Sequence, residues 1–271
     1  MIYSLKSVTK LFPQRRLQVQ ALNGVTLEVH PGEQIALLGQ SGAGKTTLFR
    51  LLNGTLRPTA GCVVFDGCDT ASLSNSGLRA MRRRVGTIYQ QHNLVPSLTA
   101  LENTLCGALG RMSFVTTLRS VFRPEKTDVE HAMHALELVG LVDKRSARAD
   151  ELSGGQQQRL AAARVLMQSP DVILADEPTA SLDPELAESM TSLLAGLARD
   201  GRKTLIMAVH KVDLALQHFP RVVGLRSGCL SFDVPPSELQ GSLLSALYAR
   251  DGKATGERDV DHLQYKLGCA R

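Results

Sequence analysis

The chain of 271 residues contains no tryptophan, and aromatic residues make up only 4% of it. Proteins that bind single-stranded nucleic acid stack bases on exposed aromatic rings, so this scarcity disfavours that class. No apolar run approaches the roughly 18 residues that a membrane-spanning helix needs. The first residues show neither a long apolar core nor a cleavage site of small residues, which a secretory signal peptide would have. We therefore expect a cytoplasmic chain without a nucleic-acid partner.

Paired cysteines are missing too, because none of the five forms a CxxC pair: Cys62, Cys68, Cys106, Cys229 and Cys269. Such scattered cysteines predict neither a zinc site nor a disulfide framework. His131 and His134 have helical spacing, and without a third ligand nearby a solvated helix face is favoured over a metal site. The net charge is +5, and the densest basic cluster is formed by arginines at 79 and 82–84. A solvated helix end is favoured over a phosphate-binding patch there.

Strand patterns alternate with helical patterns along most of the chain. Residues 25–29 alternate like a half-buried strand, whereas 35–38 and 205–209 are short apolar runs typical of buried parallel strands. The run 63–65 leads into Asp-Gly at 66–67, a turn that suggests an antiparallel lobe. Together these patterns indicate an α/β fold with an open parallel sheet and a helical insert.

Two helices carry start signals. A capping box from Thr127 to Glu130 predicts a helix with apolar residues at 129, 133, 136 and 139. In the second helix Asp183 is the expected cap and Pro184 occupies the first turn. The core stripe of that helix is predicted at Leu186, Met190, Leu193 and Leu197.

Glycines at 39, 42 and 44 follow the predicted strand 35–38 and open a helix that is expected to begin at Lys45. Gly42 and Gly44 let the backbone curl so that successive N–H groups point at phosphate oxygens, and the helix N-terminus adds partial positive charge. Lys45 is placed to reach the β and γ phosphates of a nucleotide, and Thr46 to ligate Mg²⁺. The expected phosphate-binding segment comprises Gly39, Gln40, Ser41, Gly42, Ala43, Gly44, Lys45, Thr46 and Thr47.

Four apolar residues at 172–175 lead into Asp176 and Glu177. Open α/β sheets bind ligands at the carboxyl ends of their strands, so this strand would deliver both carboxylates to that edge. Asp176 suits the shell of a Mg²⁺ ion. Glu177 is placed to accept a proton from an attacking water.

The run LSGGQ at 152–156 predicts a second anion site. Ser153 and Gln156 have the spacing of a capping box, so Ser153 is expected to cap a helix that continues to Met167. Glycines such as Gly155 expose backbone N–H groups at the positive end of that helix. A chain with its own phosphate loop needs this second anion site only if the site contacts a nucleotide that another subunit binds. The motif therefore predicts two copies that face each other.

The three motifs together resemble the ATP-binding subunit of ATP-binding cassette (ABC) transporters, and the resemblance covers nearly the whole chain. It implies a P-loop NTPase (RecA-like) core with a parallel sheet, an antiparallel β lobe and an inserted helical subdomain. The single ATPase domain is expected at 1–249, with the core at 1–90 and 158–235 and the insert at about 91–157. Residues 250–271 are expected to form a polar tail.

The resemblance also implies roles for single residues. Gln90 matches the Q-loop glutamine, Asp183 ends the D-loop Ser181-Leu182-Asp183 that crosses the dimer, and His210 matches the switch histidine that contacts the γ phosphate. Phe12 stands where the family places an aromatic ring against adenine, although tyrosine is commoner there. The implied cofactors are ATP and Mg²⁺. The residues implied for Mg²⁺ are Thr46, Gln90 and Asp176, and those implied for catalysis are Glu177, His210 and Gln90.

Weaker motifs bear on the cargo. QQHNLVP at 90–96 with LEN at 101–103 is similar to importers of small polar solutes. Phosphonate import ATPases are resembled by GALGR at 107–111, LRS at 118–120 with Phe122, HKVDLA at 210–215 and GLRSG at 224–228. The chain departs from that pattern at AVHK, 208–211, where Asn-Leu-His-Gln is expected, and in its long tail after Tyr248. Phosphonate is thus the favoured cargo, and phosphite, phosphate or another small solute stays open.

An importer of this kind implies a homodimer of ATPase subunits, peripheral on the cytoplasmic face of the inner membrane. Its partners would be transmembrane permease subunits, against which the insert docks, and an extracytoplasmic solute-binding protein that acts through them. A soluble ABC ATPase of DNA repair or translation is disfavoured, since each motif occurs once and no sustained heptads lie between the Q-loop and LSGGQ. An exporter is disfavoured because exporter cassettes are often fused to membrane spans. A nucleotide-binding regulator without turnover is disfavoured by Glu177 and His210.

Overall fold

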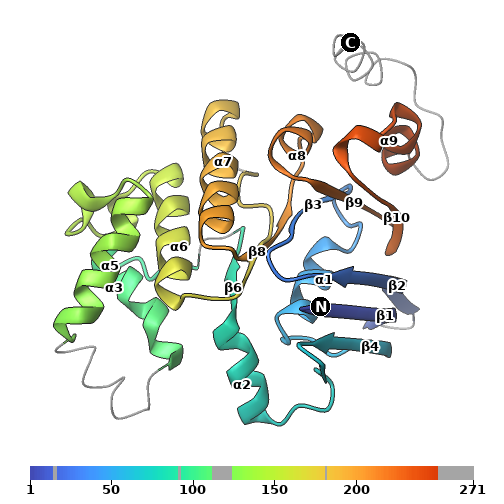
Figure 1. Cartoon of the computed structure of the whole chain (residues 1–271), viewed down its shortest axis with the longest axis horizontal. Helices are drawn as coiled ribbons and strands as arrows, with labels where there is room; N and C mark the ends of the chain where they lie inside the picture. Colours follow the sequence, from blue (N-terminus) through green and yellow to red (C-terminus); the bar gives the residue numbers. More distant parts are fainter. Residues whose placement is uncertain (15–16, 91–92, 112–123, 181, 250–271) are drawn as a thin grey trace.

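The computed structural model describes residues 1–249 apart from 15–16, 91–92, 112–123 and 181. Two sheets form the frame of the described chain (Figure 1). An antiparallel sheet has the order β2-β1-β4-β5, with β1 (Tyr3–Gln14), β2 (Leu17–Val29), β4 (Ala60–Phe65) and β5 (Cys68–Asp69). A six-stranded sheet has the order β10-β9-β3-β8-β7-β6, with β3 (Gln34–Leu38), β6 (Val85–Ile88), β7 (Val172–Ala175), β8 (Thr204–Ala208), β9 (Arg221–Arg226) and β10 (Cys229–Val234).

All pairs in the six-stranded sheet are parallel except β9 with β10. The described helices are α1 (Lys45–Leu52), α2 (Asn75–Arg84), α3 (Ala100–Leu105), α5 (Lys126–Leu138), α6 (Gly154–Gln168), α7 (Pro184–Asp200), α8 (Val212–His218) and α9 (Gly241–Tyr248). Short 3₁₀ turns lie at η1 (Cys106–Arg111), η2 (Val142–Lys144), η3 (Ala149–Glu151) and η4 (Pro236–Glu238). The expected fold class, a parallel α/β core with an antiparallel lobe and a helical insert, is confirmed.

The parallel sheet is buried on both faces, which explains its continuous apolar runs. In β3, Ile35 and Leu37 join a core with α1 and the antiparallel sheet, whereas Ala36 and Leu38 join a second core with α6, α7, α8 and α9. The residues of β7 divide between the two cores in the same alternating way. Because both faces are covered, the accessible part of this sheet is its edge, where the strands end.

The helices of the insert gather around α6, away from the antiparallel sheet (Figure 1). Helix α6 contacts α3 and α5 on one side and β6 on the other. Its apolar face includes Leu160, Ala161 and Ala163, which are fully buried. A rigid helix that contacts both parts can transmit movement of the insert to the sheet. The cargo motif at 118–122 lies outside the described residues.

Two local predictions were wrong. The capping box at Thr127 does not form, because α5 begins earlier, with Glu125 as its N-cap and no side-chain cap bond. In α7 the expected stripe is displaced: Leu186 is 39% exposed, and the buried face includes Ala187 and Leu194 together with Met190. Small alanines allow close packing of α7 on the sheet, so the buried face rotates toward them.

The arginine cluster at the end of α2 is more than a solvated helix end. Arg84 is half-buried and forms ion pairs with Asp66 and Asp171, at 2.7 and 2.6 Å. Arg82 donates to the carbonyl oxygen of Gly54 at 2.7 Å. The cluster thereby joins α2 to the β4–β5 turn, to the end of α1 and to the start of β7.

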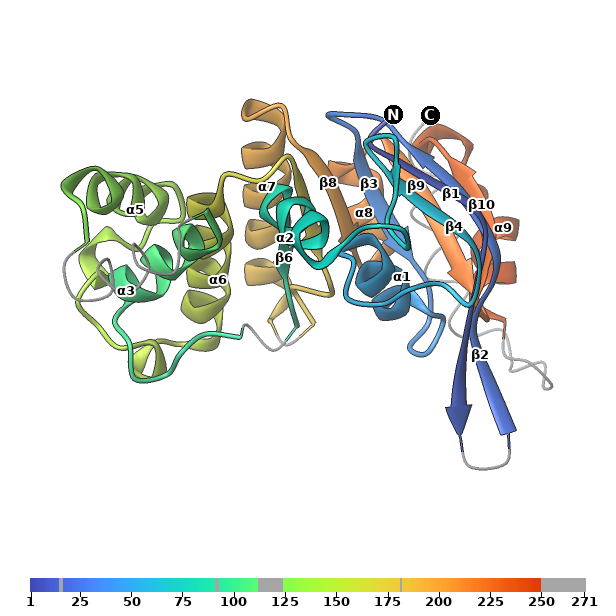
Figure 2. The same cartoon turned by 90° about the horizontal axis from the view of Figure 1, so that it is seen from below.

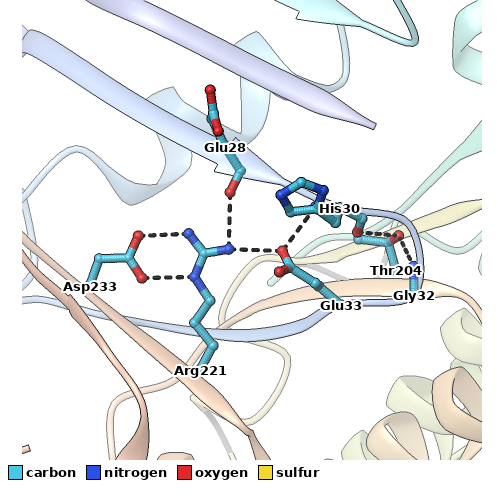
Figure 3. A network of polar contacts seen from close by, with 7 residues as sticks. All are labelled: Glu28, His30, Gly32, Glu33, Thr204, Arg221 and Asp233. Carbon is cyan, nitrogen blue, oxygen red and sulfur yellow. Dashed lines mark hydrogen bonds and ion pairs between the residues drawn. The ribbon is translucent and has the colours of Figure 1, made fainter. Parts of the chain in front are cut away.

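Arg221 joins strands of both sheets at the edge where β3 begins (Figure 3). Its guanidinium donates twice to Asp233, at 2.7 and 2.6 Å, and also to Glu33 at 2.8 Å and to the Glu28 carbonyl oxygen at 3.0 Å. Burial lowers the pKa of Arg221, but the hydrogen bond to Asp233 outweighs it, and the pKa is raised. Since β3 runs from this edge to the phosphate loop, the network fixes the sheet from the end opposite to the candidate site.

Candidate functional site

The phosphate loop connects the end of β3 to the start of α1. Gly42 and Gly44 have φ of 82° and 107°, in the left-handed region that glycine enters without steric cost. A Cβ atom at Gly44 would lie 2.5 Å from the carbonyl oxygen of Ala21. Because Gly44 is also the N-cap of α1, this conformation places the positive end of the helix against the loop.

Lys45 turns back into this loop and is 4% exposed. Its Nζ donates to the carbonyl oxygens of Gly39, at 2.6 Å, and Gln40, at 3.0 Å. The same nitrogen lies 3.1 Å from Oε1 of Glu177. The lysine that is expected to bind phosphate is therefore held by the loop and by the expected general base.

Asp176 follows β7 and is 7% exposed, and its Oδ1 atom has no hydrogen-bond partner among the described residues. Burial raises the pKa of Asp176, which the hydrogen bond from Thr46 partly offsets. A buried carboxylate oxygen without a partner beside a hydroxyl group is a donor set that Mg²⁺ accepts, with phosphate oxygens and water completing its shell. The geometry therefore fits a divalent cation at Thr46 and Asp176.

Glu177 lies between Lys45 and His210 at the end of the strand. Its Oε2 lies 2.6 Å from Nε2 of His210, and its Oε1 faces Lys45. Burial alone would raise the pKa of Glu177, but the hydrogen bonds from His210 and Lys45 together outweigh it, and the pKa is lowered. The side chain is thus held as a carboxylate, the form that accepts a proton. Its backbone is left-handed, with φ of 50°.

The LSGGQ run forms the helix start that the sequence predicts. The backbone N–H of Gln156 donates to Oγ of Ser153 at 3.3 Å, and the N–H of Ser153 donates to Oε1 of Gln156 at 3.0 Å. This capping box begins α6, and a Cβ atom at Gly154 would meet nothing within 4 Å. The start of α6 is therefore open to a ligand from outside the chain.

This helix start lies apart from the phosphate loop of the same chain. Strand β6 lies between α6 and α1 in both views (Figures 1 and 2). The neighbour of the α6 start is instead the start of α7, since a Cβ atom at Gly155 would lie 3.3 Å from Leu186. Asp183 caps α7 by accepting from the N–H groups of Glu185 and Leu186, at 3.1 and 3.0 Å.

The structure brings some of the predicted site residues together and leaves others apart. Direct contacts link Lys45, Glu177 and His210, and Thr46 bonds Asp176 beside them. Gln90 is exposed just after β6, next to residues that are not described, and Ser181 of the D-loop is also outside the described residues. Phe12 is half-buried on β1, with Nζ of Lys10 5.3 Å from its ring centre.

Comparisons with known proteins identify the family of the chain. A family model described as "ABC transporter" matches residues 22–180, more than half of the chain. The chain belongs to the ABC transporter family. Among curated ABC proteins it is similar to the phosphonates import ATP-binding protein PhnC of Alcaligenes faecalis, 44% identical over 86% of this chain and 83% of that protein. PhnC of Thiobacillus denitrificans is 44% identical over 92% of this chain and 93% of that protein.

Solved ABC cassettes have the same fold. The dimeric cassette MJ0796 in a post-hydrolysis state, bound to ADP and Pi, is 32% identical, with a TM-score of 0.75 over 87% of this chain and 99% of that one. A nucleotide-free cassette from an ABC transporter is 25% identical, with a TM-score of 0.74 over 92% of this chain and 96% of that one. The described residues of this ABC protein contain no helix with the length and apolar character to cross a membrane.

One contact of the phosphate loop was not foreseen. Nε2 of Gln40 donates to the carbonyl oxygen of Tyr248, at 2.7 Å and 208 positions away in the chain. The sequence carries no local signal for such a bond, because a glutamine in a loop and a helix end are each ordinary by themselves.

Proposed function

We propose that this chain is the ATP-hydrolysing subunit of an importer and that phosphonates are its cargo. The observation that carries the proposal is the group formed by Lys45, Glu177 and His210 at the mouth of the phosphate loop. A regulator that only binds nucleotide does not need a general base held ready by a lysine and a histidine. The printed names of the relatives support both the importer and the cargo.

In this function the phosphate loop binds the phosphates of ATP, and Lys45 leaves Glu177 to contact them. Bound Mg²⁺, held by Thr46 and Asp176 and approached by Gln90, would neutralise charge on the β and γ phosphates. Glu177 then accepts a proton from the attacking water at a carboxylate oxygen. His210, already 2.6 Å from this carboxylate, holds it in orientation and reaches the γ phosphate.

Two copies are needed because the start of α6 lies apart from its own phosphate loop. We propose that Ser153, Gly155 and Gln156 of one copy contact the ATP of the other and that Asp183 lies at the boundary between them. The exposed start of α6 and the dimeric solved relative support this arrangement.

The membrane partner would contact a basic groove of about 500 Å³ whose lining includes Tyr89, the residue before Gln90. It lies where the insert meets the core, between η1 on one side and β6 with the end of α2 on the other. None of its described lining residues is acidic. Five arginines line it: Arg79, Arg82, Arg83, Arg111 and Arg164. We propose that an acidic cytoplasmic segment of the permease docks here and that the protein lies on the cytoplasmic face of the inner membrane. The solute-binding protein would act from the other side, through the permease.

The test is reconstitution of the chain with its permease in vesicles and measurement of ATP hydrolysis with the solute-binding protein. We expect stimulation by an alkylphosphonate and little by phosphite or phosphate. Stimulation by phosphate or phosphite instead would reject the phosphonate assignment, and hydrolysis that no permease or solute affects would reject the importer. Arg83→Glu, in the groove, should reduce stimulation while the hydrolysis of the free subunit stays near its original rate. Arg145→Glu, at an exposed position just after the η2 turn, is the matched charge control.

A further inference from the structure

The phosphate loop is held from outside by segments that are distant in sequence. The N–H of Gly228, in the β9–β10 turn, donates to the carbonyl oxygen of Ala43 at 3.0 Å. A Cβ atom at Gly39 would lie 2.3 Å from the carbonyl oxygen of Leu225. These contacts involve backbone atoms, so the back of the loop is in direct contact with the end of β9.

Gln40 connects the phosphate loop to α9 through its side chain. Its amide donates to the carbonyl oxygen of Tyr248 at 2.7 Å. Tyr248 is the last residue of α9, and the last four carbonyl groups of a helix have no partner within it. The bond therefore satisfies a helix end and an amide of the loop together.

Helix α9 is firmly seated, so it can serve as a support. Leu244 and Leu247 are buried, at 2% and 0% exposure, in the core that also contains α7 and α8. Nη1 of Arg226 donates to the carbonyl oxygen of Ala246 at 2.6 Å. The position of the Tyr248 carbonyl group is thereby fixed relative to β9.

From Gln40 the contacts continue to the site of chemistry. The carbonyl oxygen of Gln40 accepts from Nζ of Lys45 at 3.0 Å, and that nitrogen contacts Glu177. An uninterrupted series of polar contacts thus runs from the end of α9 through Gln40 and Lys45 to Glu177. The conformation of residue 40 affects both the loop that receives phosphate and the lysine that must move toward it.

We propose that Gln40 is a positioning residue that holds the phosphate loop against the end of α9 and so sets the affinity for ATP. The proposal rests on the proposed function, since it concerns how strongly the loop binds the nucleotide. The side chain of Gln40 acts through the backbone of its own residue, and α9 acts through Gln40. A loop fixed in the binding conformation loses less conformational freedom when phosphate binds, which increases affinity.

Gln40→Met tests the contact, because methionine has a similar length and no charge but cannot donate. Loss of one neutral hydrogen bond should raise the Kd for Mg·ATP, and the KM, by about two- to tenfold. The kcat should fall much less, since the residues around the water are unchanged. Gln240→Glu, at the exposed start of α9, is the control and should alter neither value.

Ala249→Pro approaches the same contact from the helix side. Proline disfavours the helical conformation of the residue before it, so the Tyr248 carbonyl group should turn away. We expect a similar increase in Kd, and the double variant should bind no more weakly than the weaker single variant, because both remove one contact. This variant also keeps the proposal testable if Gln40→Met does not fold.

Two outcomes would overturn the inference: a lower melting temperature with unchanged Kd, or fully additive effects of the two substitutions. Failure of the proposed function looks different, because it concerns the unaltered protein, which would then not hydrolyse ATP or would hydrolyse it without any response to the permease or the solute. Failure of the Gln40 proposal instead appears as unchanged or additive Kd values in the variants, so the two failures are distinguishable.

Discussion

Replacement of Glu177 by glutamine separates two functions of one carboxylate. The amide has nearly the same shape but cannot accept a proton from water at neutral pH. In the structure Glu177 also holds Lys45 at 3.1 Å and His210 at 2.6 Å. We therefore expect Glu177→Gln to hydrolyse ATP more slowly and also to release Lys45 more easily.

The sizes of both effects follow from the geometry. Loss of a general base lowers turnover by about 10²- to 10⁴-fold. The substitution turns an ion pair into a hydrogen bond between the Lys45 ammonium group and a neutral amide. Hydrogen bonds to charged groups span about 1.5–3 kcal/mol, and loss of one of the two charges should weaken this contact by about 1 kcal/mol within that range. ATP competes with this contact for Lys45, hence its Kd should decrease by about fivefold. The 4% exposure of Lys45 and 16% of Glu177 limit screening by water.

The assay combines phosphate release, equilibrium binding of ATP and size-exclusion chromatography. Slow hydrolysis with tighter binding should leave an ATP-bound dimer that persists on the column. Glu185→Gln, in the exposed first turn of α7, is the matched control and should behave like the unaltered protein. Turnover at the original rate in Glu177→Gln would remove Glu177 as the base, and a higher Kd would refute the competition for Lys45.

Two further substitutions test the rest of the site and its frame. Ser153→Arg should abolish turnover while ATP binding to the monomer stays near normal, with about 1 kcal/mol of helix stability lost with the cap; loss of monomer binding would contradict a site shared between copies. Arg221→Met should lower the free energy of unfolding in urea by about 1–3 kcal/mol, a range kept modest because its partners are partly exposed. Its KM for ATP should not change, since Arg221 lies at the opposite edge of the sheet, and a large change in KM would show that the two edges are coupled.

The parts of the candidate site that could be predicted from the sequence are those formed by short continuous segments. The phosphate loop, the Asp176–Glu177 pair and the Ser153 cap each follow from a run of a few residues, because strands, glycine turns and caps are local structures. The capping-box pattern at Thr127 is also local, but it gave a wrong helix start, because α5 begins at Lys126. Leu186 was assigned to the core from periodicity, which cannot say which of two adjacent faces packs on a sheet.

Long-range side-chain contacts were not predictable from the sequence. The bond from Gln40 to Tyr248 and the network of Arg221 with Glu33 join residues 208 and 188 positions apart. Each depends on how β9, β10 and α9 fold back against β3, and this is settled by the packing of two cores rather than by any short motif.

At Glu177 the proposed catalytic role and the left-handed backbone make different demands on the residue. A residue with a side chain at φ of 50° carries about 1–3 kcal/mol of strain. Glycine would relieve that strain, but it would also remove the contacts of the carboxylate with Lys45 and His210. In the proposed function the strained residue is retained because its carboxylate accepts a proton from water. Substitutions that increase activity and those that increase stability should therefore diverge at this position.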